Sequence, residues 1–125
     1  MHWNRSNGLV VGWLILGAIL ACTLAHEAVA QQAVSMKAEN YKFIPDHIRA
    51  QKGTDLQISI ENVSATMHNI TVKDPKGNIL ASVDLPPKET RIVSVNLTQA
   101  GIYPFNCDKF LHTTLGMKGE IEVSD

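Results

Sequence analysis

Cysteine and helical periodicity are scarce in this 125-residue chain, which argues against a disulfide-rich fold and against a helical one. There are only two cysteines, Cys22 and Cys107, and no helical period is visible beyond residue 30. Residues 31–125 carry ten Lys or Arg against eleven Asp or Glu, so they offer no basic field for nucleic acid. Internal repeats and low-complexity segments are also missing. What remains is enough sequence for one small domain with one core.

The first 30 residues are typical of an export signal. A positively charged start precedes an uncharged apolar run at residues 8–25, and Ala28-Val29-Ala30 supplies small residues for cleavage. We therefore expect a signal peptide at residues 1–30, a domain at residues 31–125, and export to a bacterial periplasm. An uncleaved membrane anchor and lipid attachment at Cys22 are the alternatives, because the apolar run is long enough to span a bilayer.

Short runs of alternating apolar and polar residues, broken by turn residues, fill the rest of the chain. This pattern predicts an all-β sandwich of seven to eight strands. The apolar side chains expected to share one face of a strand include Leu56, Ile58 and Ile60; Ile79, Ala81, Val83 and Leu85; and Val93, Val95 and Leu97.

Four side chains with metal-binding chemistry fit this pattern. Side chains two residues apart on a strand share a face, so His68, Cys107 and Met117 are each predicted to point toward the core. His112 falls in the loop between the last two strands. We expect the four to gather at one end of the sandwich.

A thiol, two imidazoles and a thioether form the ligand set that copper electron-transfer sites use. Taken singly, an inward His is usually a hydrogen-bonded core residue, and a lone Cys or Met usually packs as an apolar side chain. The spacing of four residues between Cys107 and His112, and four more to Met117, favours a shared site. Removal of Cys22 with the signal peptide would leave one thiol in an oxidising compartment, and bound copper would explain its persistence.

The chain resembles the plastocyanin/azurin family of cupredoxins over roughly residues 34–123. The residues that carry the resemblance are Phe43, Pro45, Ile48, Lys52-Gly53, Leu56, Ile58, Asn62, His68-Asn69, Gly101, Tyr103, Phe105, Cys107, His112, Gly116-Met117, Gly119, Ile121 and Val123. The resemblance implies a Greek-key β-sandwich or barrel with one type 1 blue copper ion per chain. It also implies equatorial ligands at His68, Cys107 and His112, an axial ligand at Met117, and a role for Asn69 in tying down the ligand loop.

Transfer of single electrons between redox proteins is the function that this resemblance implies. Phe110, Leu111 and Leu115 surround the loop ligand His112 and are predicted to form an apolar docking patch. The expected partners are c-type cytochromes or a copper or haem enzyme, met in brief encounters. We expect no nucleic-acid partner, and contact with a membrane only if residues 1–30 stay attached or are lipidated.

Other functions fit the residues less well. A copper chaperone, store or tolerance protein is the main alternative, although residues 31–125 hold only three His and three Met and no tract of either. Multicopper oxidases and copper nitrite reductases need additional His clusters, and a dinuclear copper site needs a second cysteine. A Cys–His hydrolase would need an oxyanion donor and an orienting third group, and neither is visible. We therefore expect a carrier and not an enzyme.

Overall fold

The computed structural model describes residues 25, 28–112 and 114–125. The signal peptide or anchor predicted at residues 1–30, and the lipid attachment considered at Cys22, therefore lie almost entirely outside the described residues. In the part of the chain that is described, we find no helix with the length and apolar character needed to cross a bilayer.

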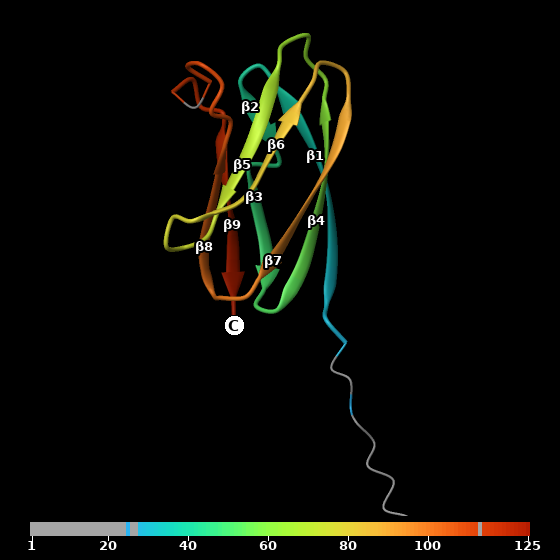
Figure 1. Cartoon of the computed structure of the whole chain (residues 1–125), viewed down its shortest axis with the longest axis vertical. Helices are drawn as coiled ribbons and strands as arrows, with labels where there is room; N and C mark the ends of the chain where they lie inside the picture. Colours follow the sequence, from blue (N-terminus) through green and yellow to red (C-terminus); the bar gives the residue numbers. More distant parts are fainter. Residues whose placement is uncertain (1–24, 26–27, 113) are drawn as a thin grey trace, which may run out of the picture.

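The described residues form two β-sheets and contain no helix (Figure 1). One sheet has the strand order β2-β1-β4-β7, and the other has the order β3-β9-β8-β5-β6. The strands are β1 (Gln31–Glu39), β2 (Lys42–Ile44), β3 (His47–Gln51), β4 (Thr54–Asn62), β5 (His68–Lys73), β6 (Ile79–Leu85), β7 (Thr90–Leu97), β8 (Gly101–Asn106) and β9 (Lys118–Ser124).

The predicted all-β class is confirmed, but the described residues hold nine strands where seven to eight were expected. The difference lies in residues 40–51, which supply two short strands, β2 and β3. The first has three residues and pairs antiparallel with β1, and the second has five and pairs parallel with β9. Strands this short leave too few alternating residues to be separated by pattern alone.

Apolar side chains from both sheets meet in one core. Leu56, Ile58 and Ile60 of β4 are fully buried, and their polar neighbours are more exposed, as the alternation predicted. Each fully buried aliphatic side chain of this size contributes about 1.5–3 kcal/mol to folding. The other large side chains that are completely enclosed are Tyr103, Phe43, Phe105, Met36, Ile70, Leu85, Leu97, Met117 and Ile121.

Strand β6 departs from its predicted face. Leu85 is buried and Ala81 and Val83 are partly buried, but Ile79 is 63 % exposed. The strand lies at the edge of its sheet, and its register with β5 shifts between Val72 and Lys73. This β-bulge takes Ile79 out of phase with the rest of the strand, so the expectation of a shared face was wrong for this residue.

Gly119 allows the last strand, β9, to pack closely against β8. A Cβ added at this position would lie 2.2 Å from the carbonyl oxygen of Asp46 and 2.4 Å from the ring of Phe105. Phe105 is the β8 residue directly opposite Gly119, and its ring fills the space that a side chain would take. The close approach of β9 to β8 therefore depends on glycine at this position.

Candidate metal centre

The candidate site lies at one end of the five-stranded sheet, where three neighbouring strands begin or end. His68 is the first residue of β5, Cys107 directly follows β8, and Met117 directly precedes β9. Because β8 lies between β5 and β9 in the sheet, these three residues come from adjacent strands. His112 belongs to the loop that joins β8 to β9, which stands at the end of the molecule opposite the C-terminus (Figure 1).

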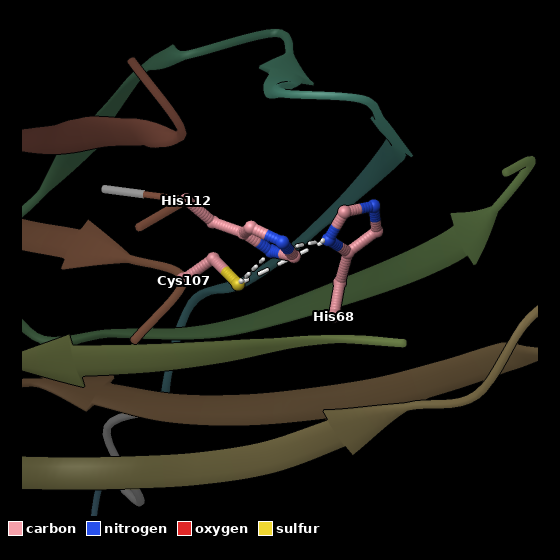
Figure 2. Close-up of side chains that lie close together, drawn as sticks. All are labelled: His68, Cys107 and His112. Atoms are coloured by element: carbon pink, nitrogen blue, oxygen red, sulfur yellow. Dashed lines mark hydrogen bonds between the residues drawn. The ribbon is translucent and has the colours of Figure 1, made fainter. Parts of the chain in front are cut away.

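His68, Cys107 and His112 point toward one another (Figure 2). The two Nδ1 atoms of the imidazoles are 3.1 Å apart, and Cys107 Sγ lies 3.4 Å from Nδ1 of His112 and 4.0 Å from Nδ1 of His68. Within the described residues, they form the one cluster of at least three His, Cys, Asp or Glu side chains with mutually close donor atoms. His68 and Cys107 are fully buried, and His112 is 8 % exposed.

The size of this triangle matches a single metal ion. A point at equal distance from atoms separated by 3.1, 3.4 and 4.0 Å lies about 2.1 Å from each, and zinc bonds to imidazole nitrogen and thiolate sulfur measure about 2.0–2.3 Å. Two imidazoles and one thiolate in a near-trigonal arrangement suit copper. The residues present therefore fit one copper ion.

Backbone hydrogen bonds fix Met117 beside the other loop residues. The amide of Cys107 donates to the carbonyl oxygen of Met117 at 3.0 Å, and the amide of Met117 donates to the carbonyl oxygen of His112 at 2.9 Å. The side chain of Met117 is fully buried, as its phase with Ile121 and Val123 predicted. Its thioether is thus enclosed at the same end of the core as the cluster.

The ring of His68 is held from its outer side by a residue of the opposite sheet. Its Nε2 lies 3.0 Å from Oδ1 of Asn40, in the turn between β1 and β2. Burial, together with the nearby imidazole of His112, lowers the pKa of His68 below its usual value. Tyr41 follows in the same turn, and its ring centroid is 4.8 Å from that of His112 and 6.4 Å from that of His68.

Asn69 connects the ligand loop to β5 through Asp108. Its side-chain Oδ1 accepts a hydrogen bond from the amide of Asp108 at 2.8 Å, and its Nδ2 donates to the carboxylate at 2.5 Å. Thr71 donates to the other carboxylate oxygen at 3.1 Å and also contacts the hydroxyl of Ser82 at 3.0 Å. The residue that follows Cys107 is therefore attached to β5 at two points.

The next residue of the loop is attached to β6. Lys109 forms an ion pair with Asp84 at 3.0 Å, and this hydrogen-bonded pairing raises the pKa of Lys109.

On the other side of the site, the fully buried Asn62 organises the loop that leads to His68. Its Nδ2 donates to the carbonyl oxygens of Thr66 and Leu85, both at 2.8 Å.

The residues predicted to form a docking patch lie on the surface of the ligand loop. Phe110 is 91 % exposed, Leu115 is 57 % exposed and Leu111 is 51 % exposed. His112 belongs to the same loop and keeps a small exposed fraction, whereas His68 and Cys107 are fully buried. The structure thus places an apolar surface next to the most accessible donor.

Sequence reasoning did not identify Asn40, Tyr41 or Asp108 as parts of this site. Asn40 and Tyr41 lie in the other sheet's β1–β2 turn, and nothing in their local sequence marks them. Asp108 follows Cys107 directly, so its proximity could have been expected. Its pairing with Asn69, 39 residues away, could not have been read from spacing.

Comparison with known protein families matches most of the chain to one family. The sequence profile of the cupredoxin-like domain matches residues 12–123. Among curated protein sequences, none matches the chain.

Solved structures share the fold at low sequence identity. The dithionite-reduced auracyanin of Roseiflexus castenholzii superposes with a TM-score of 0.68 at 19 % identity, over 77 % of this chain and 99 % of that one. Auracyanin A, a "blue" copper protein of Chloroflexus aurantiacus, gives 0.67 at 23 % identity, over 76 % and 100 %. The metal-binding domain of the Cu(I)-exporting P-type ATPase CopA of Streptococcus pneumoniae gives 0.60 at 17 % identity, over 78 % and 90 %. With the nine strands of its described residues, its His–Cys–His cluster and the profile match over most of its length, the chain belongs to the cupredoxin-like family.

Proposed function

We propose that this protein carries single electrons between redox partners through one copper ion held by His68, Cys107, His112 and Met117. The observation that carries the proposal is the buried, already assembled triangle of two imidazole nitrogens and one sulfur. A bound copper ion would supply one-electron chemistry between Cu(I) and Cu(II). The site's own residues would supply a geometry that changes little between the two states.

The rigidity of the site supports this role. Each donor residue is fixed by a hydrogen bond that does not use its donor atom. The ring of His68 is held by Asn40, and the backbone amides of Cys107, Met117 and His112 donate to the carbonyl oxygens of Met117, His112 and Lys109. A site held in this way cannot easily relax toward the geometry that one oxidation state prefers. Small rearrangement is what fast electron transfer requires.

The surface around His112 supports transient contact with a partner. The docking patch of Phe110, Leu111 and Leu115 is apolar and exposed, and it lies on the loop that carries His112. A small apolar contact suits redox proteins, which must separate quickly after each transfer. We propose c-type cytochromes, or a copper or haem enzyme, as partners in the periplasm.

An absorption spectrum of the copper-loaded protein tests the site directly. We expect an intense thiolate-to-copper band in the visible region, and we expect Cys107→Ser to abolish it while the protein stays folded. Survival of the band in the variant would refute the ligand assignment. Stopped-flow mixing with a reduced c-type cytochrome then tests the function, and exchange no faster than with free copper would contradict it.

Copper delivery or storage is the second candidate. It is favoured by the structural likeness to the CopA metal-binding domain, which was solved with Cu(I). The two candidates differ in how they release the ion. Loss of copper to a chelator should be slow for an electron carrier, because the donors are buried, and rapid for a protein that hands its copper on.

We propose a carrier and not an enzyme because the histidines of residues 31–125 cannot supply a second copper centre. Apart from His68 and His112 the remaining one is His47, which lies on β3 and contacts Glu120 and Glu122 of β9 at 3.3 and 3.0 Å. The two carboxylates contact opposite nitrogens of the ring, so the three side chains do not converge on one point. Assays for nitrite reduction and phenol oxidation by the copper-loaded protein should find neither.

A further inference from the structure

The turn between β1 and β2 brings two side chains of the four-stranded sheet to a site built on the five-stranded sheet. Asn40 lies with its Oδ1 3.0 Å from Nε2 of His68. Tyr41 places its ring edge-on to His68, at an interplanar angle of 88°, and against the ring of His112. Neither residue belongs to the strands that carry the four candidate ligands. Their contacts with His68 and His112 therefore need an explanation beyond the pairing of the ligand-bearing strands.

The contact between Asn40 and His68 determines which nitrogen of the ring can bind a metal. An amide oxygen only accepts hydrogen bonds, so Nε2 of His68 must carry the proton in this contact. A neutral imidazole has one N–H, which leaves the lone pair on Nδ1. Nδ1 is the atom that faces Cys107 Sγ and the ring of His112. The proton is thus held on the side of the ring away from the cluster.

We propose that Asn40 is a positioning residue that locks His68 in the tautomer with Nδ1 free to bind copper, and that it thereby raises copper affinity and tunes the reduction potential. This inference rests on the proposed copper site. A hydrogen bond to the outer nitrogen of a ligating histidine fixes the ring orientation and increases its basicity. Tyr41, packed against both rings, limits the rotation that would otherwise break the bond.

Asn40 is an exposed residue whose side chain contacts the site through Oδ1, at Nε2 of His68. It lies on a turn, where its backbone has no part in the pairing of β1 with β2. A substitution there can remove the acceptor and leave the core intact. The effect of the hydrogen bond can therefore be separated from the effect of folding.

The test compares Asn40→Leu, which removes the acceptor at similar size, with Asn40→Asp, which keeps it and adds a negative charge. Asn96→Leu is the matched control, because Asn96 also bonds a single side chain, that of Asp55, but lies on β7 outside the site. Copper affinity is measured by competition with a chelator. We expect Asn40→Leu to weaken copper binding about 10–100-fold, and Asn96→Leu to leave it unchanged.

Nitrogen-15 NMR of the copper-free protein reads the tautomer without any metal. In the wild-type protein and in Asn40→Asp we expect the proton of His68 on Nε2, and in Asn40→Leu a mixture of the two tautomers. The reduction potential of Asn40→Asp should fall below that of the wild-type protein, because a carboxylate makes the ring a stronger donor and favours Cu(II). An unchanged tautomer and unchanged affinity in Asn40→Leu would overturn the inference.

Its failure can be distinguished from failure of the proposed function. If the wild-type protein shows the visible band and Cys107→Ser removes it, the copper site stands, and unchanged Asn40 variants refute only the positioning role. If Asn40→Leu does not fold, Asn40→Asp still decides the matter. A potential for Asn40→Asp equal to or above that of the wild-type protein would then refute the positioning role.

Discussion

Replacement of Asn69 by Ala tests how firmly the ligand loop is attached to β5. The substitution removes two hydrogen bonds to Asp108, one from its backbone amide at 2.8 Å and one to its carboxylate at 2.5 Å. A neutral hydrogen bond contributes about 1 kcal/mol to stability, and one to a charged group about 1.5–3 kcal/mol. Asn69 itself is only 4 % exposed, but Asp108 is solvent-accessible, so water can replace part of what is lost.

We therefore expect Asn69→Ala to lower the free energy of unfolding of the copper-free protein by about 2 kcal/mol. Urea denaturation followed by far-ultraviolet circular dichroism measures this change. The matched control is Asn96→Ala, which removes a similar Asn–Asp hydrogen bond, to Asp55 at 2.6 Å, from the protein surface. Because that pair is exposed, its loss should cost no more than about 0.5 kcal/mol.

The same substitution should affect the copper site, whereas the control should not. With Asp108 detached from β5, the backbone next to Cys107 gains freedom, and copper should leave to a chelator faster from Asn69→Ala than from the wild-type protein. Equal stability losses in Asn69→Ala and Asn96→Ala, together with equal rates of copper release, would refute the reasoning. The loop would then be held by its own backbone bonds alone.

Three other predictions concern the core, the pH dependence and the surface. Gly119→Ala should destabilise the protein by about 3 kcal/mol in thermal unfolding, because the added methyl group would overlap the ring of Phe105; a loss below about 0.5 kcal/mol would contradict this packing. The copper-free protein should lose stability as the pH falls below about 6.5, because the pKa of His68 is lower in the folded protein than in the unfolded chain, which therefore binds a proton at higher pH. A free energy of unfolding that stays constant from pH 7 to 5 would argue against this. Phe110→Ser should slow electron exchange with a c-type cytochrome without changing the visible spectrum. Ile92→Ser, at a site 65 % exposed on β7, should change neither, and an equal slowing by both would exclude a specific patch.

Alternation along the strands was sufficient to predict the fold class and the inward direction of the cluster. Cys107 is fully buried and continues the alternating burial of Tyr103 and Phe105 in β8. His68 is fully buried too, but β5 is buried on both faces from His68 to Val72, so the burial of His68 alone does not test the two-residue period. A period of this kind reports only which side of a strand a residue occupies. It carries no information on which strands are neighbours, so the adjacency of β5, β8 and β9 had to come from the resemblance or from the structure.

The residues that support the ligands were harder to predict because their contacts are distant in sequence. Asn40 contacts His68 across 28 residues and from the other sheet, and its side chain is of a type common in turns. The bulge in β5–β6 was hidden for a similar reason. It arises from the pairing of two strands. Leu80, which the register shift passes over, is one apolar residue in a run that otherwise alternates from Ile79 to Leu85.

X-ray absorption spectroscopy of the copper-loaded protein tests the central claim most directly, because it counts the atoms around the metal and identifies them. We expect one sulfur and two imidazole nitrogens at about 2.0–2.3 Å, with the sulfur lost in Cys107→Ser. A copper shell made only of nitrogen and oxygen, unchanged in that variant, would show that His68, Cys107 and His112 do not hold the ion together.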